Sequence, residues 1–287
     1  MVASPPLVAL TQQMIQQPPE RAGPTFATRP RSPVRPGLES VGLAVDDTRA
    51  VLKHLAGGSS IHGVARAIAQ GNLLRKRSLN GRKHIVSAVR RRFLDAPPSL
   101  PPLSQLSACI EAVRAPRARA QLLLPYLLLT DRAAHEVCTT VVIPHMARRG
   151  ELSRGDVVEA LAAVLATNAH QSWGDAMRTR WAQGLLSVLR EVGVIGRGAR
   201  RQLFEAYSVH AEPFAFHLRG VYDAGLRGTS LVESPFWQSL LLTPAQVRSL
   251  LTDVADRGWW RVRSVAGTLE AVPVHRSLME WLADALG

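Results

Sequence analysis

One stretch of the chain is strongly basic and contains no carboxylate side chain. Between Asp47 and Asp95 lie 47 consecutive residues without an Asp or Glu. The cations of this stretch are Arg49, Lys53, Arg66, Arg75, Lys76, Arg77, Arg82, Lys83, Arg90, Arg91 and Arg92. Such a surface can bind a polyanion, because each Lys or Arg that replaces a condensed counterion gains the entropy of its release. Nucleic acid is therefore the first class of partner to expect.

The positive charge is concentrated in the first third of the chain. The whole sequence has a formal net charge of +13 and a pI near 11.2. Residues 1–95 contain 15 basic and 5 acidic side chains, which leaves +3 for the rest. Most basic residues are Arg, as a biased genome would produce, but such a bias does not explain the missing acids. This pattern favours a docking face over a merely solvated surface.

Three helices are predicted to position these cations. Turn residues and caps bound them at about residues 45–57, 60–71 and 79–94, and Ser78 is the predicted N-cap of the third. Three short helices with Gly-containing turns, of which the third is the most basic, are compatible with a helix-turn-helix-like unit. We therefore predict a basic helical DNA-binding unit over residues 41–96.

The basic residues in and just before the third helix are the predicted contacts. At 100° per residue its apolar side chains share one face, and the other side carries Lys83, His84, Arg91 and Arg92. The helix can therefore pack and present cations at once. The predicted nucleic-acid-binding residues are Arg75, Lys76, Arg77, Arg82, Lys83, Arg90, Arg91 and Arg92.

The fold is predicted to be mainly α, with helical bundles. Residues 1–40 contain eight prolines and several arginines without a sustained apolar period, which predicts a disordered leader. A proline-rich joint follows the basic unit. Beyond it, residues 103–200 contain amphipathic or largely apolar helices that we expect to form a helical bundle core.

The last part of the chain, residues 201–287, is predicted to be winged-helix-like. A short strand is expected at 203–209, and a helix follows later in this region. Residues 259–263 and 268–272 alternate as a small β-hairpin, and 275–286 form a final helix. A hairpin of this kind can contact phosphate, but it can equally cover an edge of the core.

No pattern for catalysis, a cofactor or a metal is found. The chain has no phosphate-binding loop, no dinucleotide-binding glycine pattern, no zinc-protease helix and no nucleophile elbow. Cys109 and Cys138 lie in apolar helical patterns and are expected to be reduced core thiols. We therefore expect a protein that is not an enzyme and uses no cofactor or metal.

The sequence also favours a cytoplasmic protein without a membrane span. The longest leucine run, Leu122 to Leu129, is interrupted by Pro125 and is far shorter than the roughly 20 residues that a span requires. The first residues lack the basic start of a secretory signal, and two prolines interrupt them.

Two longer patterns carry a family resemblance. The first comprises Asn72-Leu73-Leu74, Ser78, Arg82 and Arg91-Arg92-Phe93-Leu94. The second comprises Thr179, Leu185, Leu186, Leu189 and Arg190-Glu191-Val192-Gly193-Val194-Ile195. Over roughly residues 59–200 the chain resembles the BrxA family, a small helical component of the BREX bacteriophage-exclusion systems.

The resemblance implies a mainly α-helical, non-enzymatic, DNA-binding protein. It also implies that the chain acts in bacteria beside other BREX proteins, such as a methyltransferase and an ATPase. The proline-rich leader and the C-terminal hairpin depart from shorter members of the family.

Three functions are compatible with these observations. The first is an accessory protein of phage defence that binds double-stranded DNA through backbone phosphates with little sequence specificity. The second is an RNA-binding factor similar to antitermination proteins. The third is a scaffold whose basic face binds other defence proteins and no nucleic acid.

Overall fold

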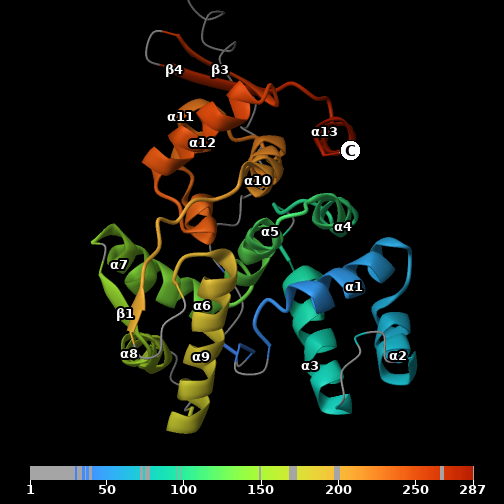
Figure 1. Cartoon of the computed structure of the whole chain (residues 1–287), viewed down its shortest axis with the longest axis vertical. Coiled ribbons are helices and arrows are strands. Elements are labelled where there is room, and N and C mark those ends of the chain that lie inside the picture. Colours follow the sequence, from blue (N-terminus) through green and yellow to red (C-terminus); the bar gives the residue numbers. More distant parts are fainter. Residues whose placement is uncertain are drawn as a thin grey trace, which may run out of the picture.

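The structure is a computed structural model of the chain, and Figure 1 shows it with its elements labelled. It describes residues 30, 34–35, 37–38, 41–71, 74, 78–94, 96–97, 99–148, 150–167, 173–196, 201–265 and 268–286. The fold is mainly helical with a small antiparallel hairpin near the C-terminus, which confirms the predicted fold class.

The helices predicted at about residues 45–57, 60–71 and 79–94 agree closely with the observed ones. In chain order the elements are α1 (Val45–Ala56), α2 (Ile61–Gly71), α3 (Leu79–Val89), the π-helical turn η1 (Arg90–Leu94), α4 (Leu103–Ala112), α5 (Pro116–Leu128), α6 (Arg132–Val137), the π-helical turn η2 (Cys138–Val142), α7 (Ile143–Ala147), β1 (Glu151–Ser153), α8 (Arg154–Ala166), α9 (Asp175–Val192), β2 (Arg201–Leu203), α10 (Ala211–Asp223), α11 (Gly228–Glu233), the 3-10 helix η3 (Pro235–Leu240), α12 (Pro244–Asp256), β3 (Trp260–Val265), β4 (Thr268–Pro273) and α13 (Leu278–Ala285).

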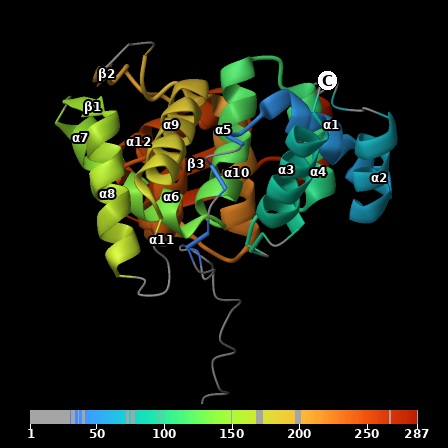
Figure 2. The same cartoon turned by 90° about the horizontal axis from the view of Figure 1, so that it is seen from below.

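Helices α1, α2 and α3 pack against one another at one side of the molecule (Figures 1 and 2). Local capping sets where two of them begin. The hydroxyl of Ser60 accepts a hydrogen bond from the Gly63 amide at 3.0 Å, and that of Ser78 accepts one from the Gly81 amide at 3.0 Å. Helix α1 also packs on α4, where Arg49 pairs with Glu111 at 3.5 Å.

The described residues between 34 and 44 lie just before α1. They form a strap, as we call this segment, between α9 and the end of α3 (Figures 1 and 2). Val34 and Leu38 are 1% and 2% exposed, although both fall in the segment predicted to be a disordered leader. The Leu38 carbonyl lies so close to Gly184 of α9 that a Cβ there would overlap its oxygen. Packing of the chain therefore starts before residue 41. Residues 1–29 lie outside the described residues.

Helix α5 is the central element, because it is buried along almost its whole length and packs against α9, α10 and η3. Its one buried amide, Gln121, joins three segments. The Gln121 Nε2 donates to the carbonyls of Val192 and Ser208, both at 3.0 Å, and its Oε1 accepts from the His210 amide at 2.9 Å. Gln121 therefore provides hydrogen-bond partners for backbone groups where α9 ends and α10 begins.

The C-terminal region consists of α10, α11, η3 and α12, followed by the β3–β4 hairpin and α13. The hairpin is antiparallel and pairs Trp260 with Pro273 at one end. Indole rings anchor it, because Trp260 contacts the Tyr222 ring edge-on at 5.5 Å and Trp259 contacts Trp281 at 5.5 Å. The hairpin was predicted correctly, and its tip lies outside the described residues.

Two sequence predictions in this part of the chain were wrong in detail. The strand expected at 203–209 is instead β2 at Arg201–Leu203, followed by one isolated bridge at Phe204. The pairing is antiparallel and places Leu203 opposite Glu151, so residues after Leu203 would need partners before Glu151, where the chain leads back into α7. The final helix starts at Leu278 and not at residue 275, because Ser277 caps it through the Glu280 amide.

Candidate nucleic-acid interface

Helix α3 presents one polar, partly cationic stripe to solvent. The exposed residues are Asn80, Lys83, His84 and Ser87 on α3 and Arg90, which starts η1 directly after it. They recur every three or four residues, so they share a face. The opposite face is buried and contains Ile85, Ala88 and Val89. The sequence Leu79–Arg90 thus holds the helix in place and leaves cations on its outside.

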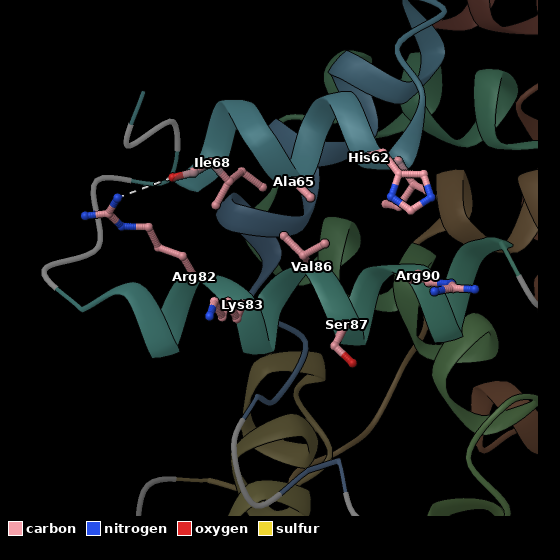
Figure 3. Close-up of a pocket in the computed structure, with 9 residues that line it drawn as sticks. His62, Ala65, Ile68, Arg82, Lys83, Val86, Ser87 and Arg90 are labelled. Atoms are coloured by element: carbon pink, nitrogen blue, oxygen red, sulfur yellow. Dashed lines mark hydrogen bonds between the residues drawn. The ribbon is translucent and has the colours of Figure 1, made fainter. Parts of the chain in front are cut away.

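A groove of about 300 Å³ lies between α2 and α3 (Figure 3). Its floor is apolar and consists of Ile61, Ala65, Ile68 and Val86. Its rim is polar and cationic and includes His62, Arg82, Lys83, Ser87 and Arg90. Lys83, Ser87 and Arg90 therefore belong both to the stripe on α3 and to the groove.

The structure places the eight predicted site residues in different environments. Lys83 and Arg90 are exposed, and no carboxylate pairs with either of them among the described residues. Arg82 is half-buried and donates from one guanidinium nitrogen to the Ile68 carbonyl at 3.4 Å (Figure 3). Arg91 is half-buried against Gly37 in the strap. The triplet Arg75, Lys76 and Arg77 lies outside the described residues.

Arg92 is not part of the outer surface, and its assignment as a nucleic-acid contact was wrong. It is 6% exposed, and its guanidinium donates to the carbonyls of Gly42 at 2.5 Å and Val41 at 2.8 Å. Arg92 follows Ile85 by seven residues and Val89 by three, so it lies on the buried face of the helix. The strap before α1 has carbonyl groups there that need donors, and Arg92 supplies them.

The same stretch without carboxylates presents exposed cations that were not among the predicted contacts. Lys53 is exposed in the last turn of α1, and Arg66 is exposed on α2. Both fall in the stretch without carboxylates, so the charge pattern already included them. Arg49 of this stretch is partly neutralised, because it pairs with Glu111 of α4.

Other functional chemistry was sought in the part of the chain that the structure describes. No group of three or more His, Cys, Asp or Glu residues there could hold a metal ion, and no helix there is long and apolar enough to cross a membrane. Cys109 and Cys138 are free and buried, and burial raises the pKa of both thiols far above its usual value. Both therefore remain protonated packing residues, as the sequence predicts.

Comparison with known proteins identifies the family of this chain. A family model described as BrxA matches residues 35–212. The chain belongs to the BrxA family. It is therefore a BREX-associated protein. The BrxA match includes the strap, the α1–α3 unit and the helices through α9, and it ends at the start of α10.

A solved structure shares the fold of this BrxA-family chain. It is the crystal structure of an uncharacterized protein from Magnetospirillum magneticum, with a TM-score of 0.58 and 16% sequence identity. The similarity covers 72% of this chain and 97% of that one. No curated protein matches the chain. At this identity the solved structure establishes the fold and nothing about binding.

Proposed function

We propose that the chain is a non-enzymatic component of a BREX phage-defence system that binds double-stranded DNA. Binding is mainly to backbone phosphates and shows little sequence specificity. The protein acts in the cytoplasm beside other BREX proteins, such as the methyltransferase and the ATPase. The observation that carries the proposal is the pair of exposed cations Lys83, on α3, and Arg90, at the start of η1, in a unit whose sequence has no carboxylate between residues 48 and 94.

The separation of these cations suits phosphate contacts. Lys83 and Arg90 are seven residues, or about two helical turns, apart, which corresponds to roughly 10 Å along the axis. They can therefore contact two different phosphates. Lys53 and Arg66 extend the positive potential over neighbouring helices of the same unit. Contacts to phosphate fix position without reading sequence, which is why we expect little specificity.

The double variant Lys83→Ala, Arg90→Ala tests this interface. Its affinity for a duplex should depend less on salt, with the slope of log affinity against log salt reduced by about 2, because each phosphate contact contributes roughly 0.9. Fluorescence anisotropy with a labelled duplex over a salt series measures this slope.

The matched control is Arg248→Ala on α12 combined with Arg257→Ala at the C-cap of the same helix. It removes the same charge, but these side chains pair with Glu233 and Asp253. Figure 1 shows α12 at the other end of the molecule from α3. The control should keep the wild-type slope, and equal losses in the two variants would contradict a localised interface. Tighter binding of structured RNA than of duplex DNA would replace the proposed ligand.

The basic triplet before α3 extends the prediction to residues outside those that the structure describes. Replacing Arg75, Lys76 and Arg77 with Ala should reduce the same slope by up to about 3 if all three contact phosphates. Unchanged binding by that variant would remove the triplet from the interface and leave the contacts on α3 itself.

A further inference from the structure

We propose that the groove between α2 and α3 is a docking site for an acidic amphipathic helix of a partner protein. Figure 3 shows apolar side chains from both helices facing each other, with cationic side chains around them. The docking itself does not depend on DNA binding. Its consequence for DNA, given below, rests on the proposed function.

The floor of the groove has the spacing that receives a helix. Ile61, Ala65 and Ile68 follow each other at intervals of four and three residues along α2, and Val86 stands opposite on α3. Helix-binding grooves present such an apolar strip to partner side chains at i, i+3, i+4 and i+7. A volume of about 300 Å³ is large enough to receive side chains, because ligand pockets begin at about 300 Å³.

The floor also favours a protein over nucleic acid as the occupant. Sugar-phosphate groups gain nothing from Ile61, Ala65 or Val86, and the hydrophobic effect favours covering these half-buried side chains. Phosphates can use only the rim. An amphipathic helix can use the rim and the floor together, so it complements more of the groove than DNA does.

The charge of the rim sets the chemistry of the partner. Arg82, Lys83 and Arg90 border the floor, and the surrounding sequence has no carboxylate between residues 48 and 94. The flanks of the docked helix must therefore be acidic. A second copy of this chain, with a net charge of +13, is repelled from this site. The arginine-containing leader of the chain is repelled for the same reason.

A shared rim makes the two ligands compete. Lys83 and Arg90 are the cations assigned to DNA phosphates, and the acidic flanks of a docked helix would occupy both. An acidic partner would therefore release the α1–α3 unit from DNA, and bound DNA would exclude that partner. The groove thus allows a defence protein to control when this chain holds DNA.

The test uses the full chain and two synthetic, fluorescein-labelled peptides of about five helical turns. One has Leu at intervals of three and four residues and Glu on its other faces, and the second has the same composition with the Leu positions scrambled. We expect the amphipathic peptide to bind at least about tenfold more tightly than the scrambled one, and some of this binding to persist at about 0.5 M salt, where charge pairing is screened.

Two variants of the floor separate docking from charge attraction. Ala65→Trp fills the floor without changing charge and should weaken peptide binding about tenfold while leaving duplex affinity within about twofold. Ile61→Lys adds a cation, so simple attraction predicts tighter peptide binding, whereas docking on the floor predicts weaker binding. Circular dichroism checks that each variant folds. If Ala65→Trp does not fold, Ile61→Lys still tests docking on the floor.

Four results would overturn the inference, its consequence for DNA or the proposed function on which that consequence rests. Equal affinity for the two peptides, or tighter binding by Ile61→Lys, would show that the floor has no role. A complex that holds the peptide and a duplex at the same time would refute the shared rim. Binding of the amphipathic peptide by a chain that binds no duplex would refute the proposed function and leave the docking site in place.

Discussion

Replacing Arg92 with Met is expected to lower the free energy of unfolding by about 3 to 5 kcal/mol, because the variant removes two hydrogen bonds from a charged donor, each worth about 1.5 to 3 kcal/mol. Met keeps the length of the side chain and removes its donors. The Val41 and Gly42 carbonyls then lose their bonds to the guanidinium. Burial raises the pKa of the half-buried Glu191 carboxyl, and the variant also removes the Arg92 charge that partly opposes this rise.

Urea denaturation followed by circular dichroism measures this change. The same variant, if folded, should keep the wild-type salt dependence of duplex binding, because Arg92 donates inward and not to solvent. Arg91→Met, at the neighbouring half-buried position, is the matched control and should cost less. A loss of stability below about 1 kcal/mol would contradict the burial of the Arg92 guanidinium. A reduced salt slope would show that Arg92 contacts DNA.

The parts of the fold that local interactions determine were predictable. Ser60 and Ser78 cap helices within three residues of themselves, and α8 has a capping box between Ser153 and Asp156. Glycine ends α9, where Gly193 adopts a left-handed conformation with φ of 84°. Each of these signals lies inside a few residues of sequence, so the helix boundaries followed from it.

The features that depend on distant partners were not predictable. Arg92 was predicted to lie on the cationic side of the helix, although at 100° per residue it falls about 20° from Ile85. Only the strap explains why a guanidinium is buried there. Gln121 has no local signal, because its three partners lie between 71 and 89 residues away in sequence. Val34 and Leu38 sit in a proline-rich context, and their burial requires the surface of α9.

In the candidate site, too, features set by local sequence were predictable and features set by distant partners were not. Val64 and Ile68 are buried on the apolar face of α2. Ile61 and Ala65 belong to the same face but remain half-buried, because α3 covers only part of it. Sequence periodicity identifies which side chains face a neighbour. It does not show how far that neighbour extends, so the groove appears only in the folded chain.

The largest pH effect is expected from His217, whose side chain lies fully buried among the rings of Tyr126, Phe216 and Phe236. Burial lowers its pKa from 6.5 to about 3, although a hydrogen bond between its Nε2 and the Leu122 carbonyl partly opposes this. Below about pH 6.5 the unfolded chain therefore binds a proton at His217, whereas the folded chain does not. Stability is fully present above that pH and falls as the pH drops towards 3.

The expected loss from this one residue is about 4 to 5 kcal/mol between roughly pH 7 and pH 3, at 1.36 kcal/mol for each pKa unit. His217→Gln keeps an amide donor for the Leu122 carbonyl and cannot titrate. Urea unfolding of both proteins at intervals of pH gives the difference between their stabilities. That difference should be constant above about pH 7 and should shift in favour of the variant as the pH falls, because only the wild type then protonates this site in its unfolded state. A difference that stays constant down to about pH 4 would mean that the folded chain protonates His217 as readily as the unfolded chain does, and that water reaches a ring that the structure places in the core.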